Sequence, residues 1–285
     1  MLLAMITRTG GYLRIRADGG PDASTQLEAD GYVVLPAAFT DDDIGALAKS
    51  IDQVFDELPP DERVEDRPDG NWQPFRYEML NRSQPVLDAI GSRSILDVIE
   101  PLLGEDCHVI ANTAWRQLAE PSSHGGRFWH IDAGPHVPRP VGVPWDPRIP
   151  YPVFAIAAHI FLRDCPIDAG PTGVIPGSHT SGQSPPRDRI GDDDLSWEGR
   201  SVVPLTASAG DVALFVSDVW HRRLPSGPED PGRYFLQCHY ARRDIAQRLR
   251  PTSLANQLSD DAIRWADDDR TRSLIGLHPP FFYDA

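Results

Sequence analysis

The stretch Gly210–Val216 (Gly-Asp-Val-Ala-Leu-Phe-Val), which ends just before a turn that leads to His221, decides the fold of this chain. Its apolar and β-branched residues, preceded by a glycine, are typical of a buried strand. Similar short runs start at Cys107 and are separated by Pro and Gly turn signals. They predict strands at 107–111, 113–118, 127–132, 153–162, 173–175, 201–205, 211–216 and 233–241. Short strands in this number favour a jelly-roll or cupin-like barrel, the double-stranded β-helix.

Helical patterns come before these strands. Thr40 is a suitable N-cap for the acidic residues that follow it, and apolar residues then recur at helical spacing from Ile44 to Leu58. A short β-prone run at 32–35 comes just before this helix, and a second helix is expected at about 84–103. The predicted fold class is therefore mainly β with flanking helices (α+β), built on a double-stranded β-helix core.

The chain is expected to form a single domain at 29–285, with the jelly-roll core at about 107–243. Residues 1–28 are expected to be an N-terminal segment that is partly flexible. Polar stretches that contain Gly and Pro predict loops, and they lie at 17–25, 59–74 and 181–200.

The composition excludes several classes of partner. The 285 residues carry a net charge of −15, whereas proteins that bind nucleic acid normally present basic surface. No window approaches the roughly 18 uninterrupted apolar residues of a membrane-spanning helix. Three cysteines without CxxC spacing predict neither a disulfide framework nor a zinc-thiolate site. We therefore expect a cytoplasmic protein without nucleic-acid or membrane partners, and the oligomeric state stays open.

A candidate metal site begins with His130 and Asp132. These two residues are separated by one position, so on a strand both side chains leave the same face, where an imidazole and a carboxylate can share a cation. A His-x-Asp pair alone occurs by chance in a chain of this composition. The pair therefore needs a third ligand from elsewhere in the barrel.

His221 is well placed to be that third ligand, because it follows the apolar strand 211–216 after a short turn. Two imidazoles and one carboxylate form the facial triad of non-haem iron(II) oxygenases, which leaves three metal positions open for an oxo-acid and O₂. Zinc more often has a closed tetrahedral set or one open position. His130, Asp132 and His221 are therefore predicted to bind Fe(II).

Arg233 is the candidate that discriminates between types of metal enzyme. It lies at the start of the strand 233–241, and the Pro- and Gly-rich turn 225–232 is expected to fold this strand back toward the metal. A planar guanidinium suits a bidentate contact to the distal carboxylate of 2-oxoglutarate. Arg233 is therefore predicted to bind this co-substrate.

With these residues in place, the chain resembles the phytanoyl-CoA dioxygenase family of iron(II)/2-oxoglutarate oxygenases over roughly residues 29–243. The resemblance implies an Fe(II) centre at His130, Asp132 and His221, a 2-oxoglutarate anchor at Arg233, and hydroxylation of a small organic molecule with release of succinate and CO₂. Four motifs in the family's order carry it, at Asp30–Leu35, Trp129–Asp132, Gly170–His179 and Gly210–Arg233.

The chain departs from the family at two points. Relatives often have a small hydroxyl residue where this chain has Arg223, and some use a lysine as a further contact to the oxo-acid. Lys49 is the only lysine of the chain and lies in the first predicted helix, so Gln117 or Arg127 is considered in its place.

Other residues complete the set of expectations. His136 and Trp145 lie in the Pro-rich segment 133–152, where a substrate-pocket loop is expected. Histidines without a partner at ligand spacing, which include His159 and His239, are expected to have ordinary packing roles. Two other functions stay open: a cupin-like metalloenzyme that does not use 2-oxoglutarate, and a non-catalytic ligand-binding barrel.

Overall fold

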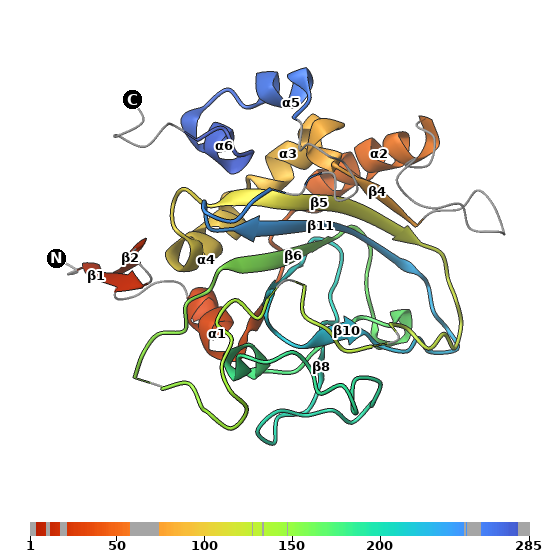
Figure 1. Cartoon of the computed structure of the whole chain (residues 1–285). Helices are drawn as coiled ribbons and strands as arrows, with labels where there is room; N and C mark the ends of the chain where they lie inside the picture. Colours follow the sequence, from red (N-terminus) through yellow and green to blue (C-terminus); the bar gives the residue numbers. More distant parts are fainter. Residues whose placement is uncertain are drawn as a thin grey trace.

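A six-stranded antiparallel sheet forms the main layer of the molecule (Figure 1). The computed structural model describes residues 22–57, 74–126, 128–132, 134–146, 148–247, 249 and 258–278, together with two N-terminal strands. Those strands, Ala4–Thr9 (β1) and Tyr12–Ala17 (β2), pair only with each other. The strands of the main sheet are, in spatial order, Tyr32–Leu35 (β3), Val212–Val216 (β9), Ala155–Phe161 (β6), Arg233–Ala241 (β11), His108–Gln117 (β5) and Phe75–Tyr77 (β4).

A second, three-stranded sheet lies below the first in Figure 1. It contains His221–Arg223 (β10), Thr172–Val174 (β7) and Val203–Pro204 (β8) in that spatial order. An isolated antiparallel bridge also joins His130 to His221. Within the described residues the two sheets share no strand, so the double-stranded β-helix is open rather than closed.

Six α-helices in the described part of the chain flank the sheets. Among them, α2 has the signals that the sequence predicted: Asp43 N–H donates to Thr40 Oγ1 at 3.2 Å, and Thr40 N–H donates to Asp43 Oδ2 at 3.1 Å. In Figure 1, helices α2, α3, α5 and α6 lie on the upper side of the main sheet. Their bounds are Asp22–Asp30 (α1), Asp41–Glu57 (α2), Gln84–Ile90 (α3), Arg93–Leu103 (α4), Asp260–Trp265 (α5) and Asp269–Leu274 (α6).

Alternate residues of the central strand β11 enter two different environments. Leu236 and Cys238 are fully buried in the large apolar cluster between the sheet and the helices. Phe235 points the other way, into a smaller cluster between the two sheets. Because successive side chains of a strand point to opposite faces, one strand contributes both to the core and to the barrel interior.

Four sequence predictions about elements were wrong. The single helix expected at 84–103 is two helices, because the chain leaves helical geometry at Gly91 and Ser92 caps a new helix by accepting from Ser94 N–H at 3.2 Å. The loop expected at 17–25 ends early, since α1 begins at Asp22. The strands expected at 107–111 and 113–118 are one continuous strand, β5.

The strand expected at 127–132 is also absent: among its described residues only His130 makes a β-bridge. In contrast, β10, α5 and α6 were not predicted at all. The loop expected at 59–74 lies, apart from its last residue, outside the described part of the chain.

Candidate metal centre and co-substrate site

Backbone hydrogen bonds bring the three predicted metal ligands together. His130 and His221 exchange two of them, each N–H donating to the other's carbonyl oxygen at 3.0 Å. Asp132 N–H donates to the carbonyl of Ser217 at 3.1 Å. The segment that contains His130 and Asp132 is thus fixed against β10 even though it is no regular strand.

The side chains of His130, Asp132 and His221 form a group that can bind a metal ion. Their ligand atoms all lie within 4.8 Å of one another, and His221 Nε2 is 3.3 Å from Asp132 Oδ1. His130 Nδ1 lies 3.1 Å from the Phe128 carbonyl and His221 Nδ1 lies 2.8 Å from the Val219 carbonyl. A carbonyl only accepts, so in the neutral form of each ring Nδ1 carries the proton and Nε2 has the lone pair that can bind a metal.

The charges of this group are strongly coupled. Burial raises the pKa of Asp132, but the nearby His221 and His239 outweigh this effect and hold the pKa below its ordinary value. Burial lowers the pKa of His221, and the Asp132 carboxylate more than offsets it, so that pKa is raised. Burial and the neighbouring His221 lower the pKa of His130. A carboxylate that stays ionised beside two imidazoles is a suitable donor set for a divalent cation.

Arg233 and Gln117 lie opposite each other at one end of the barrel interior. They are register partners on β11 and β5, and Arg233 Nε donates to Gln117 Oε1 at 2.7 Å; a second guanidinium nitrogen, NH2, donates to the same oxygen. Arg233 is 7% exposed. Burial, with a contribution from nearby Arg223, lowers the pKa of the guanidinium to about 9. A buried cation of this kind favours binding of an anion.

Two histidines for which the sequence predicted ordinary packing roles also face the site. His239 Nδ1 is 3.7 Å from Asp132 Oδ2. His159, on β6, is 5% exposed and packs on the Phe235 ring with centroids 4.5 Å apart. The signal that could have found His239 is its parity: Arg233, Phe235 and His239 are separated by even numbers of residues on one strand.

His136 and Trp145 are not members of the group formed by the three ligands. His136 Nδ1 is 2.6 Å from Asp218 Oδ1, and its ring stacks on Phe154. Trp145 packs edge-on against Tyr151 and donates from Nε1 to the Ile149 carbonyl at 2.6 Å. Arg127 lies outside the described residues.

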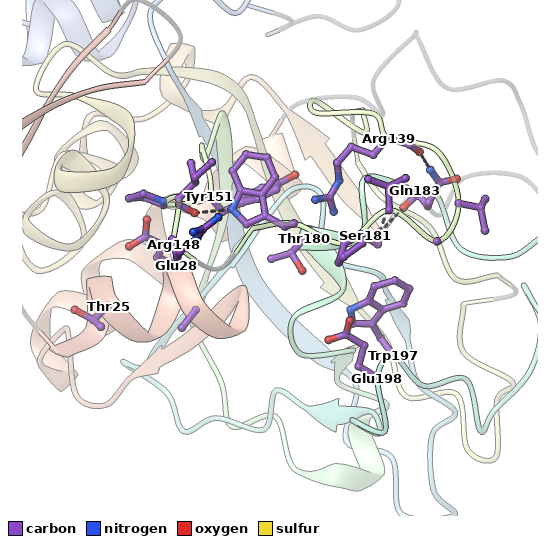
Figure 2. A pocket seen from close by; sticks show the side chains of 18 residues that line it. Thr25, Glu28, Arg139, Arg148, Tyr151, Thr180, Ser181, Gln183, Trp197 and Glu198 are labelled. Carbon is purple, nitrogen blue, oxygen red and sulfur yellow. Dashed lines mark hydrogen bonds between the residues drawn. The ribbon is translucent and has the colours of Figure 1, made fainter.

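Trp145 lines a pocket of about 1020 Å³ that contains none of the three predicted ligands. Figure 2 shows Arg139, Tyr151 and Trp197 around this pocket. Tyr151 also connects the pocket to His136, since Tyr151 Oη donates to Asp218 Oδ2 at 3.5 Å and the same carboxylate contacts His136. The pocket-lining loop presents apolar side chains to solvent, with Val141 86% exposed and Ile149 51% exposed.

The match to a protein family covers this whole arrangement except its last strand. The profile of the phytanoyl-CoA dioxygenase family matches residues 27–225. The chain belongs to the phytanoyl-CoA dioxygenase family. Family membership and the group His130, Asp132 and His221 support the predicted class of enzyme, a non-haem dioxygenase that uses Fe(II), 2-oxoglutarate and O₂. Arg233 lies beyond the matched residues, so its assignment depends on its position in the barrel.

Individual relatives are distant. A curated relative, dioxygenase lolE1 of Epichloe uncinata, is 25% identical over 150 residues, which are 52% of this chain and 52% of that protein. The match thus spans about half the length of the curated relative. Among solved structures, the epimerase SnoN in complex with Fe³⁺, α-ketoglutarate and nogalamycin RO matches with a TM-score of 0.58 at 16% identity, over 80% of this chain and 86% of SnoN.

EctD from S. alaskensis, in its apo form, matches with a TM-score of 0.57 at 21% identity, over 84% of this chain and 83% of EctD. These two structures confirm the predicted double-stranded β-helix. Among the described residues, no helix is both long enough and apolar enough to cross a membrane.

Proposed function

We propose that this member of the family hydroxylates a small organic molecule and converts 2-oxoglutarate to succinate and CO₂. The observation that carries the proposal is the pairing of the group His130, Asp132 and His221 with a buried arginine, Arg233, inside one open barrel. Either feature alone, the group of three ligands or the buried arginine, fits other classes of protein. Together they provide a metal with open positions and a cation for a bound dicarboxylate.

In this proposal His130, Asp132 and His221 bind Fe(II) through two Nε2 atoms and one carboxylate oxygen. The fit is supported by Asp132 Oδ2, which is buried and has no hydrogen-bond partner among the described residues. It is also supported by the two carbonyl contacts that place the proton of each neutral imidazole on Nδ1, so that Nε2 is the atom that can bind a cation. When bound, the iron supplies O₂ activation coupled to decarboxylation of the co-substrate.

Arg233 is proposed to bind the distal carboxylate of 2-oxoglutarate, and Gln117 to orient Arg233. Gln117 Oε1 accepts from both Nε and NH2 of the guanidinium, which fixes the plane of the donor fork. The remaining donors of Arg233 are then available to an anion inside the barrel. The cupin-like alternative without 2-oxoglutarate gives no reason for a buried arginine at this place.

The pocket beside Trp145 is the proposed place for the organic substrate. Its lining combines aromatic and aliphatic side chains with a few polar groups, as small-molecule sites usually do. His136 is proposed to contribute to this pocket through its contact with Asp218, which also accepts from Tyr151, and not to bind the metal. The cytoplasm stays our prediction for location, supported by three cysteines that are all free and buried.

The test is succinate formation by the purified protein with Fe(II), 2-oxoglutarate and O₂. Such enzymes turn over slowly without substrate, so we expect a measurable rate, abolished by Asp132→Ala. Asp97→Ala is the matched control, because Asp97 lies on the solvent side of α4 with 54% of its side chain exposed. A wild-type protein that consumes no 2-oxoglutarate contradicts the proposal.

A second measurement tests the anchor. Removal of a buried charged hydrogen-bond donor typically costs about 1.5–3 kcal/mol, so Arg233→Ala is expected to weaken 2-oxoglutarate binding at least about tenfold. Arg93→Ala, with 66% of its side chain exposed, is the control and leaves affinity unchanged. Equal affinity in wild type and Arg233→Ala would show that the co-substrate anchor lies elsewhere.

A further inference from the structure

A row of polar side chains leads from Trp115 on β5 to Asp132. Trp115 Nε1 donates to Gln237 Oε1 at 2.8 Å, and Gln237 Nε2 lies 2.8 Å from His239 Nε2. His239 Nδ1 then lies 3.7 Å from Asp132 Oδ2, which is beyond hydrogen-bond distance but within range of an electrostatic interaction. The four residues come from β5, β11 and the metal-binding segment, so tertiary structure alone brings them together.

The chemistry of these groups fixes the direction of every proton. An indole N–H can only donate, so the Gln237 atom facing Trp115 is the carbonyl oxygen and the atom facing His239 is the NH₂ group. That NH₂ group can only donate, so His239 Nε2 is the acceptor. The His239 proton therefore sits on Nδ1, directed toward the carboxylate of Asp132.

We infer that Trp115, Gln237 and His239 form a relay that positions the Asp132 carboxylate for metal binding. His239 directs a proton toward Oδ2, which has no hydrogen-bond partner among the described residues, and leaves Oδ1 facing His221. Outer partners of this kind orient ligating groups and hold their basicity. The inference rests on the proposed metal ligands.

The relay also explains why His239 is no fourth ligand. One of its ring nitrogens accepts from Gln237 and the other carries the proton directed at Asp132, so neither lone pair is directed at the cation. The candidate set stays at three residues and the open metal positions stay open. His239 is thus a positioning residue rather than a catalytic one.

The test is anaerobic Co(II) binding, followed by the d–d absorption band, to wild type, His239→Phe and Trp115→Phe. Loss of an outer-shell partner typically costs 10–100-fold in metal affinity, so His239→Phe is expected to weaken Co(II) binding by about that factor and to shift the band. Trp115→Phe keeps an aromatic ring but removes the indole N–H that donates to Gln237. It is expected to weaken binding severalfold in the same direction.

Leu236→Val is the control, since Leu236 lies on the same strand but faces the helices. It is expected to leave Co(II) affinity and band position unchanged. Wild-type affinity and an unshifted band in both His239→Phe and Trp115→Phe overturn the relay. Failure of wild type itself to bind Co(II) overturns the proposed metal site instead, so the two results are distinguishable.

A different observation, the charge around Arg233, carries a second inference. Arg223 shares a strand face with His221 on β10 and is paired in register with Thr172 of β7. Its guanidinium lies 3.8 Å from Asp230 Oδ2 and 3.6 Å from Glu120 Oε2, beyond hydrogen-bond distance. Its Nε and NH2 atoms are buried and have no hydrogen-bond partner in the described part of the chain.

Asp230 does not neutralise both arginines. Its two carboxylate oxygens accept from the backbone N–H groups of Glu120 and Gly232, at 2.9 and 2.7 Å. Glu120 has 68% of its side chain exposed, so water screens its charge. Arg223 and Arg233 thus face one buried carboxylate, and one further negative charge would balance the group.

We propose that Arg223 is a second cationic contact to the distal carboxylate of 2-oxoglutarate, and that the pair selects dicarboxylic over monocarboxylic 2-oxo acids. The proposal rests on Arg233 as the anchor. It is consistent with the burial and mutual repulsion that lower the pKa of Arg233 to about 9, because a bound anion relieves both effects.

The test is titration of the anaerobic Fe(II) enzyme with 2-oxoglutarate and with pyruvate, followed by the charge-transfer band. Arg223→Ser is expected to weaken 2-oxoglutarate binding about tenfold or more and to leave pyruvate binding unchanged, because pyruvate has no distal carboxylate. Arg223→Lys keeps the charge and is expected to recover part of the affinity. An unchanged affinity for 2-oxoglutarate in Arg223→Ser overturns this proposal, whereas no binding to wild type overturns the anchor at Arg233.

Discussion

The two faces of the six-stranded sheet differ in what they bury. The face toward the helices is almost entirely apolar, and on β11 it presents Leu236 and Cys238. The face toward the barrel interior presents Arg233, Gln237 and His239 from the same strand, beside aromatic rings such as Phe235. Neighbouring positions of one strand are therefore under different constraints.

This difference separates stability from chemistry along a single stretch of sequence. Apolar burial against helices stabilises the fold and is indifferent to the identity of the bound molecule. Polar groups of the interior hydrogen-bond to one another, as in the pairs Arg233–Gln117 and Gln237–His239. Substitutions on the face toward the helices, the outer face, are expected to change stability alone. Substitutions on the face toward the barrel interior, the inner face, are expected to change binding.

The largest effect on stability is expected for Leu236→Ala. Leu236 is fully buried between the sheet and the helices, and deletion of such a side chain typically costs about 2–5 kcal/mol. Urea denaturation should show this loss, while 2-oxoglutarate affinity below the transition stays at the wild-type value. A large drop in affinity in the folded variant would contradict the separation of the two faces.

A buried histidine outside the barrel interior gives the next largest effect, and it depends on pH. Burial lowers the pKa of His179 to about 4, and Nε2 donates to the Glu28 carbonyl at 3.0 Å. Because the folded-state pKa lies below the ordinary 6.5, the unfolded chain takes up this proton first as pH falls. Stability from neutral His179 is complete above about pH 6.5 and is lost progressively toward pH 4, by roughly 3 kcal/mol.

Urea midpoints measured between pH 7 and 4.5 test this expectation. His179→Gln keeps a donor for the Glu28 carbonyl but does not titrate, so its stability should depend less steeply on pH than that of wild type. Parallel pH profiles for the two proteins would show that His179 does not contribute. Other buried histidines, such as His159, affect both proteins equally and cancel in the comparison.

On the inner face, Phe235→Leu is expected to cost binding more than stability. Leucine preserves much of the apolar volume, so the free energy of unfolding should change by less than about 1.5 kcal/mol. The Phe235 ring lies 5.3 Å from the Arg233 guanidinium and packs on His159, and such a cation–π contact is worth about 0.5–1 kcal/mol. Isothermal titration should therefore show a twofold to fivefold loss of 2-oxoglutarate affinity. A loss of stability without any loss of affinity would break the proposed role of the inner face.

The sequence predicted most of the main sheet because its strands contain apolar and β-branched runs bounded by turn signals. Strand β10 escaped prediction since its three residues, His221 to Arg223, are polar and are held by pairing with β7 rather than by propensity. The helix expected at 84–103 is interrupted after Ile90, because Ser92 accepts from Ser94 N–H and caps a new helix, which outweighs the helical pattern on both sides.

The candidate site shows the same limit. His130, Asp132, His221 and Arg233 follow from spacing and family motifs, and strand parity could have added His239. The link between His136 and Asp218 could not be predicted, because the two residues are far apart in sequence and meet only through tertiary structure. The same is true of Asp230, whose position beside Arg223 depends on the path of the turn between β10 and β11.

The smallest effect is expected on a third kind of surface, the solvent side of α4. Arg93 and Asp97 form an ion pair four residues apart, with 66% and 54% of their side chains exposed. Such pairs stabilise a helix by about 0.3–0.5 kcal/mol and are screened by salt. Asp97→Asn should therefore lower the free energy of unfolding by no more than this at low ionic strength, and by less at 1 M salt. A loss above about 1 kcal/mol would mean that exposed charges contribute as much to stability as the smaller buried contacts. Stability would then depend on the solvent-exposed surface as well as on the face of the sheet that packs against the helices.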